Sequence, residues 1–146
     1  MKTDLQTHFD NLGLTPQASQ WLLDVWDAIQ LFDDVADKDD IERKDLDRVI
    51  YSAFVGFNQN QFFSENYHSL NGLLNVALVK WQASDTAERT GKANEKSFVW
   101  RASYYDLVVY CTILCQGYEF AHKNSQYLMD MYGEDYKDYI KEFKNA

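Results

Sequence analysis

The chain has 146 residues, of which 46% are hydrophobic and 16% aromatic, and it carries a formal net charge of −9. This length favours one domain that buries roughly 70% of its unfolded surface, and this composition excludes a disordered chain. The acidic balance leaves no basic patch for a phosphate backbone, so we expect no nucleic-acid binding, and no apolar run approaches the ~20 residues of a membrane span.

Every long segment shows helical rather than alternating periodicity. This pattern predicts an all-α fold, a single compact bundle of about five to six helices that forms one domain over residues 1–146. The first predicted helix covers residues 4–12 and stops at Gly13. The second starts with Thr15 as its N-cap and Pro16 at its first helical position, and it continues to about Asp37.

The third predicted helix covers residues 40–57, with Asp39 and Glu42 as a capping box. Its spacing predicts a buried stripe made of Leu46, Val49, Ile50, Ala53, Phe54 and Phe57. Ser64 is predicted to cap a fourth helix that reaches about Arg89. A fifth, very apolar helix over 94–122 and a sixth over 124–143, interrupted at Gly133, complete the bundle.

Two features favour a cytoplasmic protein with no membrane association. The start of the chain, Met1-Lys2-Thr3-Asp4, carries no signal-peptide core. The only cysteines, Cys111 and Cys115, lie one helical turn apart. We expect both to act as small core residues in a reducing compartment.

Five aspartates fall within residues 33–40, at the end of the second predicted helix. Helical spacing places Asp33, Asp34 and Asp37 on one side, where they repel one another and meet the partial negative charge of a helix C-terminus. A divalent cation would offset both penalties, and hard cations such as Mg²⁺ favour carboxylate oxygens. The sequence therefore predicts a Mg²⁺ (or Mn²⁺) site with these three aspartates as ligands.

A simpler interpretation of the same run stays open. Asp39, Asp40 and Glu42 precede the third predicted helix, where acidic residues are favourable without any metal. Asp27 and Gln30 fit the solvent face of the second helix, and charge runs usually are solvated faces.

Further candidate residues lie outside this run. Asp106 sits among apolar neighbours on the fifth predicted helix, which makes it the candidate catalytic carboxylate or else a structural partner of a tyrosine or an arginine. Groups that would bind a diphosphate substrate come from the residues after the run and from a polar strip on the fourth helix: Arg43, Lys44, Asn75, Asp85, Glu88 and Arg89.

The stretch from Ile29 to Lys44 resembles the first aspartate-rich region of class I isoprenoid (terpenoid) synthases. In that family an Asp-Asp-x-x-Asp helix end binds Mg²⁺ bridged to an allylic diphosphate, and a basic pair often follows. The resemblance implies an all-α fold, metal-assisted ionisation of a diphosphate, and ligand roles for Asp33, Asp34 and Asp37. The chain also resembles small tailed-phage proteins of unknown function, with Tyr132-Gly133-Glu134-Asp135 near its end, which implies a bacterial host cytoplasm.

Three functions remain open from the sequence. The first is a Mg²⁺-dependent binder or enzyme of a small diphosphate compound. The second is an all-α nucleotide pyrophosphohydrolase with Asp34/Asp37 and Asp85/Glu88 as its two acidic pairs. The third is a non-catalytic acidic phage or bacterial protein that binds a host or virion protein through its carboxylates. A homodimer that completes a site is compatible with each of them.

Overall fold

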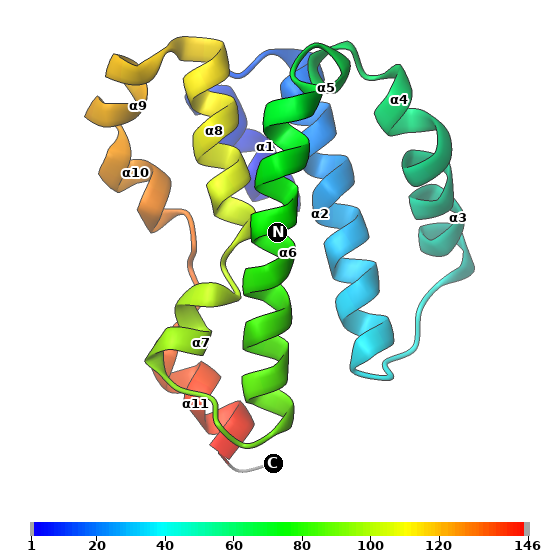
Figure 1. The fold of residues 1–146 in the computed structure, drawn as a ribbon, viewed down its shortest axis with the longest axis vertical. Coiled ribbons are helices and arrows are strands. Elements are labelled where there is room, and N and C mark those ends of the chain that lie inside the picture. The colour runs from blue at the N-terminus through cyan, green and yellow to red at the C-terminus, as the bar shows by residue number, and fades with distance from the viewer. Residues whose placement is uncertain (1, 145–146) are drawn as a thin grey trace. The chain divides into compact units, whose positions relative to one another are not determined.

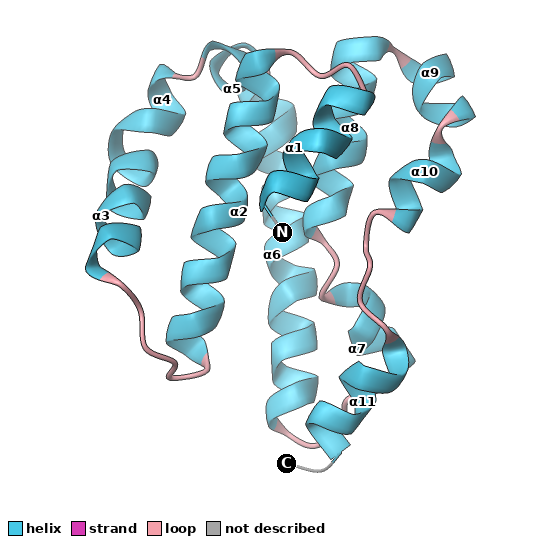
Figure 2. Cartoon of the chain, turned by 180° about the vertical axis from the view of Figure 1, so that it is seen from behind, coloured by secondary structure: helices cyan, strands magenta, loops and turns pink. Residues whose placement is uncertain are grey.

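The computed structural model describes residues 2–144, which fold into helices joined by short loops, with no strand among them (Figures 1 and 2). The predicted all-α class is therefore confirmed. The described chain contains more helices than the predicted five to six, so that number is wrong. It divides into two compact units, Met1–Tyr67 and His68–Ala146. The single domain over residues 1–146 stays a prediction.

The first unit starts with the helices that the sequence predicts most closely. Helix α1 (Lys2–Asn11) is followed by Gly13, whose φ of 67° turns the chain into α2 (Pro16–Ala36). The Thr15 side chain accepts a hydrogen bond from the Ala18 backbone N–H at 3.2 Å, and Pro16 starts the helix. This cap and the proline are the predicted ones, because both depend on local sequence alone.

The predicted third helix is shorter and less buried than expected. Residues 39–42 are extended, and α3 (Arg43–Tyr51) begins after Glu42, whose side chain makes no capping hydrogen bond. The predicted Asp39/Glu42 capping box is therefore wrong, because the chain must travel back beside α2 before it can coil again. Helix α3 continues into a π-helical turn, η1 (Ser52–Gly56), and a last short turn, α4 (Phe57–Gln59).

The predicted buried stripe of this segment is also largely wrong. Val49 is buried and Leu46 and Phe57 are half-buried, but the other predicted members, Ile50, Ala53 and Phe54, are exposed. Within the unit α3 packs on α2 through the face that carries Val49, so the opposite face points to solvent.

Helix α5 (Gln61–Glu65) closes the first unit. The Asn60 side chain caps it by accepting from the Phe63 N–H at 2.9 Å. Ser64 lies inside this helix, and the long helix that it is predicted to cap begins at Tyr67, so the predicted Ser64 cap is wrong. Asn60 Nδ2 also donates to the Gln17 carbonyl at 2.9 Å, and the Phe62 N–H donates to Gln17 Oε1 at 3.1 Å. These bonds attach α5 to the first turn of α2, where the Phe63 ring stacks on Trp21.

The second unit contains the long helix α6 (Tyr67–Arg89), which starts at the unit boundary and ends just before Gly91, as predicted. Five shorter helices follow: α7 (Glu95–Trp100), α8 (Tyr104–Gln116), α9 (Tyr118–Lys123), α10 (Ser125–Asp130) and α11 (Tyr136–Lys144). The predicted fifth helix is thus three helices, broken over 101–103 and at Gly117, whose φ of 92° is incompatible with an α-helix. No helix in residues 2–144 combines the length and apolarity that a membrane crossing requires.

Candidate functional site

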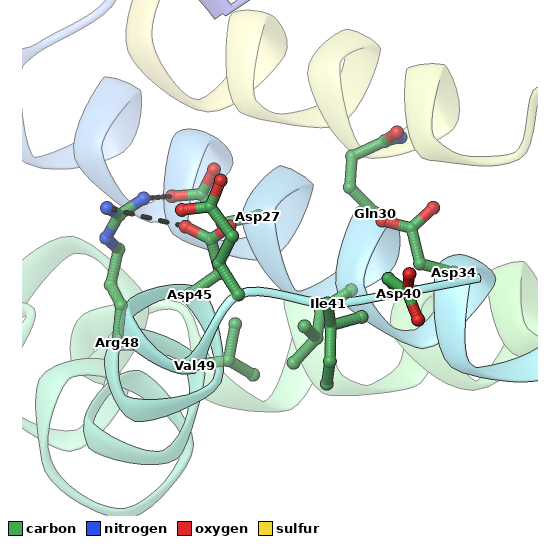
Figure 3. A pocket seen from close by; sticks show the side chains of 10 residues that line it. Asp27, Gln30, Asp34, Asp40, Ile41, Asp45, Arg48 and Val49 are labelled. Carbon is green, nitrogen blue, oxygen red and sulfur yellow. Dashed lines mark ion pairs between the residues drawn. The ribbon is translucent and has the colours of Figure 1, made fainter. Parts of the chain in front are cut away.

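An acidic cavity of about 330 Å³ lies within the first unit, between the second half of α2, the turn after it and α3 (Figure 3). Its lining follows helical spacing along both helices, so that one face of α2 meets one face of α3. The lining residues are Asp27, Gln30, Leu31, Asp34, Asp40, Ile41, Glu42, Asp45, Arg48 and Val49.

The turn after α2 brings Asp40 and Ile41 to this cavity. The Asp39 N–H bonds to the Asp34 carbonyl at 2.8 Å and the Lys38 N–H bonds to the Val35 carbonyl at 3.1 Å, which is the Schellman pattern of a helix end. Lys38 occupies the left-handed position with φ 61°, where glycine is usual. This turn reverses the chain and directs residues 39–42 back along α2.

One end of the cavity is neutralised by basic side chains. Asp27 Oδ2 lies 2.6 Å from Lys2 Nζ and 3.7 Å from Arg48 Nη1, and Asp45 lies 3.7 Å from Arg48 Nη2. Figure 3 shows Arg48 reaching across to both carboxylates. Electrostatic attraction therefore stabilises this end within the chain itself.

The other end of the cavity has surplus negative charge. Asp34 and Asp40 both line it (Figure 3), and among the side chains that the structure describes no basic group lies within ion-pair distance of either. Glu42, at the mouth, pairs with Lys44 at 3.2 Å. The Asp34–Asp40 end is therefore the part of the cavity that would gain most from an external cation.

The wall between these two ends is apolar. Leu31 and Val49 are buried, and Ile41 is partly exposed where the extended segment crosses the cavity. Figure 3 shows Ile41 and Val49 lying between the Arg48 end and the Asp34–Asp40 end. A ligand in this cavity would therefore meet mainly polar groups, with carboxylates at the Asp34–Asp40 end and hydrocarbon at the wall between the two ends.

The predicted metal ligands are only partly brought together. Asp34 lines the cavity, whereas Asp33 and Asp37 do not. No group of three or more His, Cys, Asp or Glu side chains with metal-binding geometry occurs in the described residues. The predicted basic pair also lies outside the lining, because Arg43 pairs with Asp47 at 3.2 Å and Lys44 pairs with Glu42.

The remaining predicted site residues lie in the second unit, where most contact neighbouring side chains. Asp106 forms a 2.7 Å ion pair with Lys80, whereas the sequence suggested a tyrosine or an arginine as its structural partner. Asp85 pairs with Arg89 at 2.8 Å on α6, and Asn75 donates to the Asn71 carbonyl one turn earlier. Their predicted roles in substrate binding stay predictions.

Glu88 belongs to a polar cluster in the second unit that the sequence did not reveal. Arg101 Nη1 lies 3.8 Å from Glu88 Oε2 and 3.4 Å from Glu134 Oε1, and the guanidinium stacks over the Tyr139 ring at 4.9 Å. The Tyr139 hydroxyl donates to Glu88 at 3.0 Å and lies 2.7 Å from Ser97 Oγ. This cluster attaches α11, through Tyr139, to α6 and α7.

The pKa values in this cluster reflect burial. Burial and the Glu88 carboxylate raise the pKa of Tyr139 to about 12, against a lowering contribution from Ser97. Burial, followed by the hydrogen bond to Glu134, raises the pKa of Tyr132 far above its usual value. Burial lowers the pKa of Arg101, but Glu134 and Glu88 raise it by more, so the guanidinium stays charged. The cluster is thus a closed set of paired charges and neutral phenols.

The two units differ sharply in formal charge. The first contains 13 acidic and 5 basic residues, a net charge of −8, whereas the second contains 10 acidic and 9 basic residues, a net charge of −1. Nearly all of the chain's net negative charge therefore belongs to the unit that holds the cavity.

Sequence reasoning missed Arg48, Asp45 and the place of Asp40 in the cavity lining. A signal for the helical residues exists in the spacing: residues 27, 31 and 34 on α2 and residues 45, 48 and 49 on α3 recur at helical intervals. Such spacing indicates a shared face on each helix. It does not indicate which faces meet.

Comparison with known proteins leaves the chain without a relative to argue from. It matches no protein-family model, no curated protein and no solved structure. The resemblance of its aspartate-rich segment to class I isoprenoid synthases, and that of the chain to tailed-phage proteins, therefore remain predictions from the sequence. The function is inferred below from the cavity and its charges.

Proposed function

We propose that the first unit is a non-catalytic binding module that receives a lysine or arginine side chain of a partner protein in the acidic cavity. The observation that carries this proposal is the Asp34–Asp40 end, where two carboxylates face one cavity with no basic side chain of the described residues beside them. A cationic head group placed there would make charge-assisted hydrogen bonds with both.

The apolar wall supports a long side chain rather than a small cation. Lysine and arginine carry hydrocarbon stems that pack on apolar surface while their charged heads reach polar groups. Leu31, Ile41 and Val49 provide such a surface along the cavity. The volume of about 330 Å³ lies at the small end of the range for ligand pockets, which suits a single side chain.

The charge of the unit supports a protein partner with a basic surface. A net charge of −8 on 67 residues attracts basic partners and accelerates their encounter, and salt screens this attraction over about 10 Å at 0.1 M ionic strength. We therefore expect association that weakens as salt is added.

The test compares a charge-removing variant in the cavity with a matched variant elsewhere. Asp34→Asn/Asp40→Asn removes two negative charges from the cavity, and Glu119→Gln/Asp130→Asn removes two from exposed positions in the second unit. Binding of a fluorescent Gly-Arg-Gly-Arg-Gly peptide is measured by anisotropy at two salt concentrations. We expect about tenfold weaker binding in the cavity variant only. If binding weakens equally in both variants, the weakening is explained by the change in net charge alone, and the proposal is wrong.

Mg²⁺ with a diphosphate is a second candidate, because Asp34 and Asp40 face the same cavity. Mg²⁺ typically uses one or two carboxylates together with substrate phosphate oxygens. Melting curves with EDTA, with Mg²⁺ or Mn²⁺, and with each metal plus inorganic diphosphate distinguish this candidate from the first. A metal-dependent rise in Tm that diphosphate increases further, and that Asp34→Asn abolishes, would favour this second candidate. Melting curves that neither metal nor diphosphate changes would rule it out and leave protein binding as the remaining candidate.

A further inference from the structure

We propose that a second surface of the first unit, on the side of α3 away from the cavity, docks a basic amphipathic helix of a partner protein. Four large apolar side chains define this surface, here called the apolar stripe: Ile50, Tyr51, Phe54 and Val55. The exposed fractions are 46% for Ile50, 55% for Tyr51 and 77% for Phe54. This inference concerns a different face from the cavity and does not require that the cavity holds a ligand.

The stripe is contiguous along the helix. Ile50 with Phe54 and Tyr51 with Val55 are pairs four residues apart, which lie one above the other on a helix surface. The cavity-facing residues Asp45 and Val49 belong to the other side of the same helix. Contiguous exposed apolar surface of this kind marks interaction sites on soluble proteins.

The backbone under the stripe is unusual. Residues Ser52–Gly56 form a π-helical turn, and Phe54 and Val55 lie within it. Such turns are rare and occur frequently at functional positions. Ser52 in this turn is buried, and Gly56 sits against the Tyr51 ring, where an added Cβ would lie 3.5 Å from the ring edge. The turn therefore holds Phe54 outward on a well-packed base.

Charge decides which helix would cover the stripe. A second copy of the chain would bring a unit of net charge −8 against another of −8, which opposes self-association through this face. A partner helix that carries lysine or arginine gains from the same charge. The complementary occupant is therefore a basic helix of another protein.

The location of the charge fixes the pattern of that helix. The basic residues of α3 are already paired, Arg43 with Asp47 and Arg48 with Asp45, so the surplus carboxylates near α3 are those of the turn before it, including exposed Asp39 and Asp40. The helical path from residue 43 to residue 52 spans about 14 Å at 1.5 Å per residue, and Asp39 and Asp40 lie before its start. The matching helix carries apolar residues at one end and basic residues about three turns or more away.

The experiment uses a synthetic helical peptide with leucines at one end and lysines at the other, labelled for fluorescence anisotropy against the full chain. Two control peptides replace the lysines by glutamate or the leucines by alanine. The stripe variant is Ile50→Ser/Phe54→Ser, and the matched control is Val99→Ser/Met129→Ser, which changes two exposed apolar side chains of the second unit. Circular dichroism and Tm establish that each variant is folded.

We expect the leucine–lysine peptide to bind the wild-type chain and the control variant alike, and the stripe variant about tenfold or more weakly. Both control peptides should lose most of the binding. No saturable binding by about 1 mM peptide, or equal binding to both variants, would overturn the proposal. It would also be overturned by sedimentation that shows a wild-type dimer and a monomeric stripe variant, because the occupant would then be a second copy.

Discussion

The cavity of the first unit and the Arg101 cluster of the second use the same chemistry in opposite ways. In the cluster, Arg101 lies between the Glu88 and Glu134 carboxylates and stacks on Tyr139. In the cavity, Arg48 serves Asp27 and Asp45 at one end, while Asp34 and Asp40 lack such a partner in the described chain. Charges that are paired internally stabilise a fold, whereas carboxylates left without a cation are available to a ligand.

The largest expected effect on stability comes from removing the cation of the Arg101 cluster. Arg101→Met removes the guanidinium and keeps an unbranched apolar stem, so Glu88 and Glu134 lose their cation in a partly buried site. We expect the free energy of unfolding to fall by about 3 kcal/mol, measured by urea denaturation.

The matched control for that variant is Arg89→Met. Arg89 also pairs with a carboxylate, Asp85, but its side chain is 63% exposed. Because exposed ion pairs contribute about 0–1 kcal/mol, this change should alter the free energy of unfolding very little. Similar losses in the two variants would show that the cluster adds nothing beyond ordinary surface pairing.

A smaller effect is expected when only the phenol of the cluster is removed. Tyr139→Phe leaves the ring in place but takes a hydrogen-bond partner from Glu88 and Ser97, which should cost about 1–2 kcal/mol at pH 7. Tyr118→Phe, at an exposed position, is the control.

The same variant has a defined pH dependence. The pKa of Tyr139 is about 12 in the folded chain against an ordinary value of 10, so its contribution is complete below pH 10 and is lost as pH rises toward 12. Urea denaturation at pH 7 and pH 11 should therefore show a smaller difference between wild type and Tyr139→Phe at pH 11. A difference that stays constant would contradict burial of a neutral phenol.

At the acidic turn, backbone conformation and charge can be separated at one residue. Lys38 holds a left-handed φ that is costly for lysine, so Lys38→Gly should raise the free energy of unfolding by about 0.5–1 kcal/mol. Lys38→Ala keeps the strained backbone and removes the charge, and it should give no gain. If both variants are destabilised equally, the loss comes from the missing lysine charge, and the left-handed backbone at this position carries no measurable strain. Thermal denaturation at low and high salt provides the measurement.

The smallest expected effect concerns Asp24, a half-buried carboxylate of α2. Burial, with a further contribution from Asp27, raises its pKa above the ordinary 3.8, against a lowering hydrogen bond from Gln20. Because the pKa of Asp24 is higher in the folded chain than the ordinary 3.8 of the unfolded chain, stability falls as pH rises from 3.8 through the raised pKa. Asp24→Asn should therefore stabilise the chain at pH 7, on the order of half a kcal/mol, and give no gain at pH 3.

The control for Asp24 lies on α1. Asp10 also accepts a hydrogen bond from a glutamine one turn earlier, Gln6 at 2.9 Å, but it is exposed. Asp10→Asn should leave the pH profile of stability unchanged. A gain from Asp10→Asn as large as that from Asp24→Asn would assign the effect to net charge rather than to burial.

The parts of the fold that the sequence predicts are those that local chemistry determines. Thr15, Pro16, Gly13 and Gly91 mark helix ends with side-chain caps, a fixed φ or a left-handed turn, and the structure confirms them. The break over residues 101–103 contains neither glycine nor proline, so no local signal announces it.

The site illustrates the limit of a helical wheel. Asp33, Asp34 and Asp37 share one side of an ideal helix, but α2 ends at Ala36, and only Asp34 reaches the cavity. Asp40 joins it through the left-handed turn at Lys38, which the sequence does not signal because lysine rarely adopts that conformation. Likewise, periodicity finds the apolar face of α3 but not whether anything covers it, so Ile50 and Phe54 are predicted as core.

The hydrogen bonds between Gln17 and the start of α5 have a topological consequence for the cavity. They join positions 43 and 45 residues apart, and every cavity residue lies in the chain segment between them. In the folded chain the segment is a loop closed between Gln17 and Phe62, and closing it has an entropic cost that grows only slowly with the length of the loop. The hydrogen bonds of Gln17 with Asn60 and Phe62 thus close the segment that forms the cavity, although none of these three residues lines it.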